Sequence, residues 1–223
     1  VTRHVLSGTA TLEFDKKNAA TKTLLLDTRD LDIKKIKCKT SGAALEFKVD
    51  SPVSSLGSKL EIQLASKVAD RFGICIQYET SPNSTALQWL KPEQTAGGKH
   101  PYLFSQCQAI HARSLLPCQD TPSVKAPYTA KITCDNALTA LMSAVPEGSE
   151  PHPDNKDVRV HSFKQAVPIP SYLIAIVAGA LESRKIGPRS KVWSEKEMVD
   201  AAAYECAETE EMIATAEKLL GPY

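Results

Sequence analysis

Two glutamines separated by a single cysteine are the residues of this sequence best suited to bind a ligand. Gln106, Cys107 and Gln108 follow an aromatic and apolar run and precede an Arg, a Pro and an Asp, within the stretch from Lys99 to Asp120. A buried amide needs partners for its donors and acceptors, so these side chains either tie neighbouring backbone together or face a ligand. Loop polar residues more often serve structure, and both interpretations stay open at this point.

A cysteine nucleophile is the other chemistry that this stretch offers. His111 lies close in sequence to Cys107 and Cys118, and an activated thiol needs a base that a third group orients. No such third group is evident, and a small apolar role is commoner for cysteine. His100 and His111 we interpret as loop residues rather than a ligand pair.

The sequence lacks the motifs of other enzyme classes. The five histidines, His4, His100, His111, His152 and His161, include no HExxH pair, in which two histidines share one helix face and the glutamate acts as base. There is no GxSxG elbow and no glycine-rich phosphate loop. The chain therefore carries no catalytic residues and no metal ligands that the sequence can identify.

Charge and cysteine usage exclude several classes of partner. The 223 residues carry 27 basic and 26 acidic side chains, a net charge of +1, so we expect neither nucleic acid nor a membrane as partner. The longest apolar run, Tyr172 to Leu181, is shorter than the roughly 20 residues that cross a bilayer. Six cysteines without CxxC spacing favour a reducing, cytoplasmic setting. In that setting the sequon at Asn83 would stay unmodified.

The elements that must position the glutamines are mostly strands. Apolar residues alternate with a period of two in short runs, and Asp, Asn, Gly, Ser and Pro separate these runs, which predicts a large, mostly antiparallel β domain with a saddle-like set of sheets. In the first run we expect Ala10, Leu12 and Phe14 to be buried. The predicted strands are Leu6 to Phe14, Thr23 to Leu26, Leu31 to Cys38, Leu45 to Val49, Leu60 to Leu64, Phe72 to Thr80, Tyr128 to Cys134, Ala140 to Val145, Val158 to Val167, and Tyr172 to Gly179.

Two further features set expectations for the second half of the chain. The run from Tyr172 to Gly179 is apolar on both faces, which predicts a central, doubly covered strand entered at Pro168 and Pro170. From Ser194 to Leu220 apolar residues recur every three or four positions, which predicts one long helix with a capping box of Ser194 and Glu197. The expected domains are a β domain over 1–193 and a helix over 194–223.

A resemblance extends over almost the whole chain. The segments FSQCQAIHARSLLPCQDTPSVK and VPIPSYLIAIVAGALESRKIGPRSKVWSEKE resemble the amino-terminal domain of the leukotriene A4 hydrolase-like zinc aminopeptidases, and the similarity runs from about Gly8 to Tyr223. The resemblance implies that Gln106, Cys107, Gln108 and Ala109 form one wall of a substrate cleft. It also implies that Gln108 helps to hold the free amino group of a peptide.

The resemblance places the chemistry outside this chain. In that family zinc is bound by HExxH and a further glutamate, and these residues, the glycine-rich substrate segment and a catalytic tyrosine lie beyond Tyr223. We therefore expect the isolated chain to bind no zinc and to be inactive, with the helix leading toward an absent catalytic domain. The full-length protein would be a cytoplasmic zinc aminopeptidase and epoxide hydrolase that acts on peptide or lipid-epoxide substrates. The alternative is a stand-alone, non-enzymatic β binding module.

Overall fold

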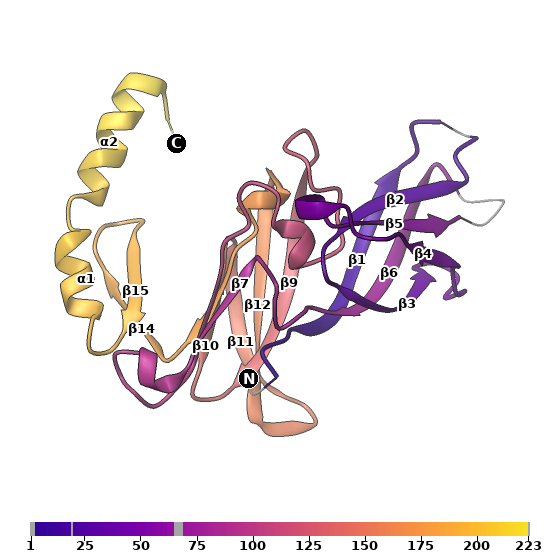
Figure 1. Ribbon diagram of the computed structural model, residues 1–223. Coiled ribbons are helices and arrows are strands. Elements are labelled where there is room, and N and C mark those ends of the chain that lie inside the picture. The colour runs from indigo at the N-terminus through magenta and orange to yellow at the C-terminus, as the bar shows by residue number, and fades with distance from the viewer. Residues whose placement is uncertain (1–2, 19, 65–68, 223) are drawn as a thin grey trace.

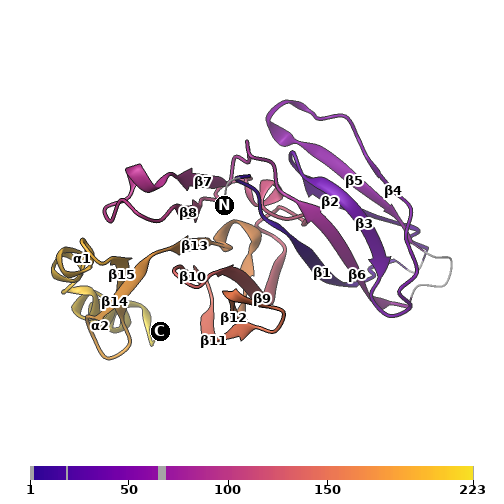
Figure 2. The same cartoon turned by 90° about the horizontal axis from the view of Figure 1, so that it is seen from below.

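The computed structural model describes residues 3–18, 20–64 and 69–222, and strands dominate it (Figure 1). The first half forms a sandwich of two antiparallel sheets, which Figure 2 shows one above the other. One sheet has the order β1 (Ser7–Asp15), β6 (Arg71–Glu79), β3 (Asp32–Cys38). The other has the order β2 (Thr23–Thr28), β5 (Ser58–Gln63), β4 (Phe47–Val49).

The sandwich core follows from the period-two pattern of its strands. Alternate residues point between the sheets, and burying them removes apolar surface from water. Leu12 and Phe14 of β1 pack against this core, on the side that the sequence predicts. The fully buried members are Leu26, Ile36, Leu60, Ile62, Ile74 and Ile76.

A four-stranded antiparallel sheet, built from strands that follow the sandwich in the chain, carries the glutamines. Its order is β10 (Thr139–Met142), β13 (Ile176–Gly179), β8 (Tyr102–Ser105), β7 (Leu87–Leu90). A neighbouring sheet has the order β11 (Val145–His152), β12 (Asn155–Pro170), β9 (Lys125–Asp135). Short 3-10 helices lie between the strands, at η1 (Ser54–Leu56), η2 (Pro92–Gln94), η3 (Ala112–Ser114) and η4 (Ser171–Leu173).

The chain ends in a hairpin and two helices at the far side from the sandwich (Figure 1). The hairpin pairs β14 (Leu181–Lys185) with β15 (Lys191–Glu195), and α1 (Val199–Glu205) packs on both strands. After a turn, α2 (Thr209–Leu220) is held by ion pairs from Arg189 to Glu210 and Glu217. In the described parts of the chain, no helix is long and apolar enough to span a membrane.

The mostly antiparallel β fold and the helical end are confirmed, with changes at element boundaries. The helical segment begins at Val199 rather than Ser194, because Ser194 pairs with Glu182 in the hairpin and makes no cap. It is also interrupted between Glu205 and Thr209. The segment from Ala140 to Val145 does not form one strand, since it contributes to both β10 and β11.

Proline positions account for the other differences. β12 runs through Pro168 to Pro170, so these prolines end a strand instead of marking the entry to the next one. The pairing of β12 with β9 is irregular between Gln165 and Ile169, which lets proline lie there without a lost ladder bond. The expected central strand is confirmed as β13, between β10 and β8, but it starts at Ile176 after η4.

Candidate functional site

The two glutamines directly follow β8, at the end of a strand that lies inside its sheet. Gln106, Gln108 and Ala109 are exposed, whereas the side chain of Cys107 is 2% exposed and packs in the core. We call the segment Gln106 to Ala109 the glutamine wall. The structure therefore presents three of its four residues to solvent, and Cys107 fixes the backbone from the inner side. The peptide bond between Gln108 and Ala109 is cis.

The side-chain amides of Gln106 and Gln108 differ in which hydrogen-bonding groups remain available. The side-chain oxygen Oε1 of Gln106 accepts a hydrogen bond from the backbone N–H of Gln108 at 3.1 Å. Because this contact uses the oxygen, it is mainly the side-chain N–H groups of Gln106 that remain available to donate hydrogen bonds to a ligand. Within residues 3–18, 20–64 and 69–222, the side-chain amide of Gln108 has no hydrogen-bond partner. Gln106 thus partly fills the bracing role that the sequence allows, while Gln108 is free to bind a ligand.

Backbone contacts hold both ends of the glutamine wall. At its start, the N–H of Gln106 donates to Ala86 O at 2.8 Å and the N–H of Ile176 donates to Ser105 Oγ at 2.9 Å. At its end, the N–H of His111 donates to Cys107 O at 2.8 Å. These bonds tie the wall to the residue that precedes β7, to β13 and to the loop that follows the wall.

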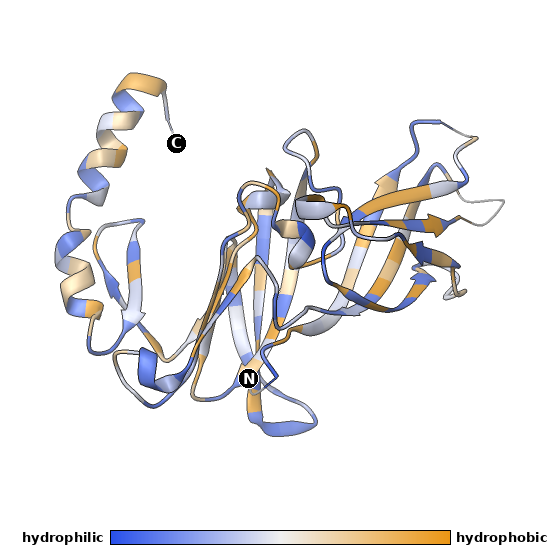
Figure 3. Ribbon diagram, in the orientation of Figure 1, coloured by the Kyte–Doolittle hydropathy of each residue, from blue (hydrophilic) through white to orange (hydrophobic). Residues whose placement is uncertain are grey.

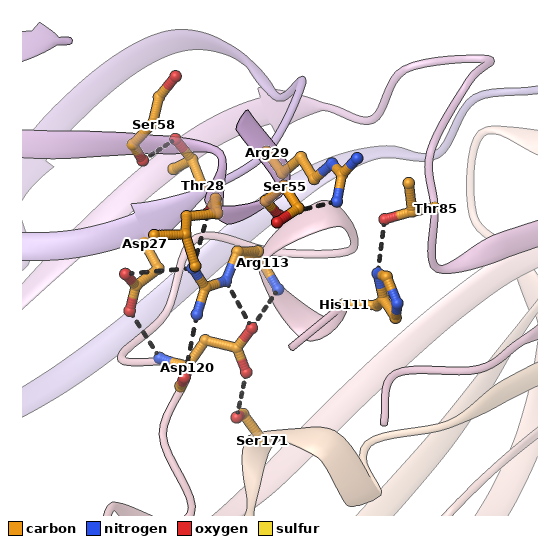
Figure 4. A network of polar contacts seen from close by, with 11 residues as sticks. Asp27, Thr28, Arg29, Ser55, Ser58, Thr85, His111, Arg113, Asp120 and Ser171 are labelled. Atoms are coloured by element: carbon orange, nitrogen blue, oxygen red, sulfur yellow. Dashed lines mark hydrogen bonds and ion pairs between the residues drawn. The ribbon is translucent and has the colours of Figure 1, made fainter. Parts of the chain in front are cut away.

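That loop contains a buried ion pair, drawn in Figure 4. The Nε of Arg113 donates to Asp120 Oδ2 at 2.9 Å, and the two residues are 7% and 6% exposed. Ser171 donates its hydroxyl to Asp120 Oδ1 at 2.7 Å, and Asp27 Oδ2 accepts from the N–H of Asp120 at 2.9 Å. The sequence offered the residue types but no spacing rule that links these four positions, so their association is a result of the structure alone.

The structure does not assemble the thiol nucleophile. The ring nitrogen Nδ1 of His111 lies 2.9 Å from Thr85 Oγ1 rather than beside a thiol (Figure 4). Burial, reinforced by the negative charge of Asp120, raises the pKa of Cys107 to about 12. Burial also raises the pKa of Cys118. Both thiols therefore stay protonated at neutral pH and act as small core residues.

Two hollows in the surface lie away from the glutamine wall. One of about 300 Å³ is at the other end of β8, where Lys99 and His100 line it together with the start of β14 and the end of β15. The carboxylate of Glu195, which lines this hollow, accepts hydrogen bonds from the backbone N–H groups of Ala96 and Gly97. None of the four wall residues lines it. The wall is therefore exposed surface outside this hollow.

The described residues contain no group of three or more His, Cys, Asp or Glu side chains that could hold a metal ion. Residues 1–173 match the family described as Peptidase M1 N-terminal domain. The chain belongs to this family. The match confirms the resemblance read from the two sequence segments.

Relatives with described functions extend the family match. The chain is 49% identical over 203 residues to leukotriene A-4 hydrolase of Xenopus laevis, which covers 90% of this chain and 33% of that protein. It is 43% identical over 219 residues to leucine aminopeptidase 2 of Yarrowia lipolytica, covering 98% of this chain and 32% of the relative. The chain thus spans about a third of the length of these relatives and corresponds to their N-terminal domain.

Solved structures agree with the sequence relatives. Yeast LTA4 hydrolase in complex with bestatin superposes with a TM-score of 0.88 at 39% identity, over 99% of this chain and 33% of that one. Native yeast LTA4 hydrolase gives a TM-score of 0.87 at 41% identity, over 98% of this chain and 33% of that one. This chain therefore corresponds in sequence and fold to the N-terminal domain of leukotriene A4 hydrolase-like M1 aminopeptidases.

Proposed function

We propose that this domain supplies one side of the substrate cleft in a full-length zinc aminopeptidase, with Gln108 holding the free amino group of a peptide. The observation that supports this most directly is the exposed Gln108 amide, which has no hydrogen-bond partner among the described residues while its neighbour Gln106 is engaged. A glutamine carbonyl accepts hydrogen bonds from an ammonium group without a second buried charge. Ala109, exposed beside Gln108, would line the cleft next to it.

The remaining chemistry would come from a catalytic domain. Zinc there would supply Lewis-acid activation of water for attack on a peptide carbonyl or for opening a lipid epoxide. In this chain, Gln108 would orient the amino end of the substrate, and Gln106 would offer its amide N–H groups to a carbonyl or hydroxyl oxygen. We assign the β domain to 1–193, the connection toward the catalytic domain to 194–223, which holds the end of β15 and both helices, and the setting to the cytoplasm.

The test of this function is Gln108→Ala in the full-length protein. If the Gln108 carbonyl holds the substrate ammonium, the change removes one charge-assisted hydrogen bond worth about 1.5 to 3 kcal/mol, a roughly 10- to 150-fold loss in kcat/KM. Peptides with a blocked amino end should lose little. Steady-state kinetics on a matched pair of free and blocked peptides measures both effects.

Gln108→Glu and thermal melting complete the experiment. The glutamate restores an acceptor and adds a negative charge, so activity on free peptides should recover relative to alanine. If Gln108 only braces the loop, the alanine variant should instead melt at lower temperature and lose activity equally on both peptides. An unchanged kcat/KM with a lowered Tm would remove Gln108 from the binding site.

A further inference from the structure

The buried ion pair of Arg113 and Asp120 uses nearly every polar atom that it has. Asp120 Oδ2 accepts from both the backbone N–H and the Nε of Arg113, at 3.2 and 2.9 Å, and Asp120 Oδ1 accepts from Ser171. The Nη1 of Arg113 donates to Leu56 O at 2.7 Å, and Nη2 donates to Asp120 O at 3.2 Å. A buried ion pair is a weak source of stability by itself, but hydrogen bonds to nearly all of its polar atoms hold it in one geometry.

The pair joins three segments that are distant in the sequence. Leu56 ends η1 and Asp27 lies on β2, so both belong to the sandwich. Arg113 and Asp120 flank the loop after the glutamine wall, and Ser171 begins η4. We call Arg113, Asp120, Ser171 and Asp27 the Arg113 clamp. Figure 4 shows their side chains converging on one point between these segments.

The clamp lies next to both anchors of the glutamine wall. On one side, Arg113 belongs to η3, which directly follows His111. The backbone N–H of His111 donates to the carbonyl oxygen of Cys107. On the other side, Ser171 is the first residue of η4, and η4 leads to Ile176. The backbone N–H of Ile176 donates to Ser105 Oγ. A shift of the clamp would therefore move two of the three bonds that fix the wall, and the sandwich contacts resist such a shift.

We propose that the Arg113 clamp is the positioning device for Gln106 and Gln108, with Ser171 as the residue that couples η4 to it. This inference rests on the proposed function only for its kinetic consequence. Small displacements of a group that orients a substrate lower the reaction rate, because the reacting atoms must be positioned to within about 0.5 Å of the productive geometry. None of the clamp residues touches the substrate; they act through the wall.

Hydrogen exchange on the 223-residue chain tests the structural half of the proposal. Ser171→Ala removes one donor to Asp120, and we expect exchange at the amides of Gln106, Gln108 and His111 to rise about tenfold. Ser171→Thr restores a hydroxyl and should restore the slow exchange. Ile36→Val, a core change in the sandwich, is the control for a general loss of stability. Equal exchange of the wall amides in Ser171→Ala and Ile36→Val would overturn the proposal.

Kinetics of the full-length protein tests the functional half through a double-mutant cycle. Ser171→Ala should lower kcat/KM for peptides with a free amino end about tenfold, but less than twofold when Gln108→Ala is already present. Equal losses in both backgrounds would overturn the coupling. If Gln108→Ala alone has no effect, the proposed function fails, and the exchange experiment still decides whether the clamp holds the wall.

Discussion

His161 lies in the middle of β12 with only 9% of its surface exposed. Its ring nitrogen Nε2 is buried and has no hydrogen-bond partner among the residues that the structure describes. Burial, and to a smaller extent the positive charge of Arg159, lower the pKa of His161, and a contact with the Leu138 backbone opposes this only weakly. The folded state therefore prefers the neutral ring.

This preference makes stability depend on pH. Below the ordinary histidine pKa of about 6.5, the unfolded chain binds a proton at His161 that the folded chain does not, so the free energy of unfolding falls as the pH falls. We expect His161→Gln to flatten the fall in Tm between about pH 7 and pH 5. His152→Gln, in the β11–β12 hairpin, is the control. Equal slopes for wild type and His161→Gln would show that this ring is not the source.

Single residues also show how much of the candidate site could be predicted from the sequence. The resemblance and the residue types drew attention to Gln106 and Gln108, but only the structure distinguishes the engaged Gln106 from Gln108, whose side chain has no partner among the described residues. The clamp escaped sequence reasoning because Asp27, Arg113, Asp120 and Ser171 become neighbours through tertiary packing. No local spacing rule connects positions on β2, η3 and η4.

At the level of elements, the turn after η1 is a place where backbone geometry is tightly constrained. Gly57 has φ +84° and ψ −149°, a region that only glycine occupies readily, and an added Cβ would meet Thr28 O at 2.3 Å. The preceding carbonyl, Leu56 O, accepts from Arg113. This turn therefore has to pass close to β2 to reach the clamp.

Gly57→Ala should lower the free energy of unfolding by about 2 kcal/mol or more, because strain and a backbone clash add. Gly42→Ala is a matched control: Gly42 also has positive φ, +71°, but nothing lies within 4 Å of an added Cβ. We expect that control to lose only about 1 kcal/mol. Urea unfolding of both variants measures the difference, and equal losses would contradict the steric part of the argument.

The element boundaries that the sequence misplaced share one physical cause. The period-two pattern located most strands because alternation reports directly on burial in a sheet. At Ser194 a capping signal competed with pairing to Glu182, and the tertiary pairing prevailed. At Pro168 a breaker signal was overridden because the ladder is already irregular there. Local signals fail where a partner distant in the sequence decides the conformation.

The molecule as a whole leaves one apolar surface uncovered. α2 carries Met212, Leu219 and Leu220, which are 64%, 77% and 87% exposed, and Figure 3 shows hydrophobic turns along this helix. None of the α2 residues, all of which the structure describes, is fully buried. The helix is attached to the hairpin by Arg189 and Ser190 through their contacts with Glu210 and Glu217. Met212, Leu219 and Leu220 thus form an apolar stripe that the described part of the chain leaves exposed.

Because the chain spans about a third of its relatives, we expect the catalytic domain to cover this stripe in the full-length protein. The isolated chain should then self-associate through it, and Leu219→Glu should reduce that association in sedimentation velocity experiments. In the full-length protein the same change should lower stability by about 2 kcal/mol, since a buried leucine side chain contributes roughly that amount. Ala214→Glu adds the same charge at an exposed position on the opposite side of α2 and should do neither. If Leu219→Glu changes association of the isolated chain no more than Ala214→Glu does, and leaves full-length stability intact, the stripe is a solvent-exposed face and not a domain contact.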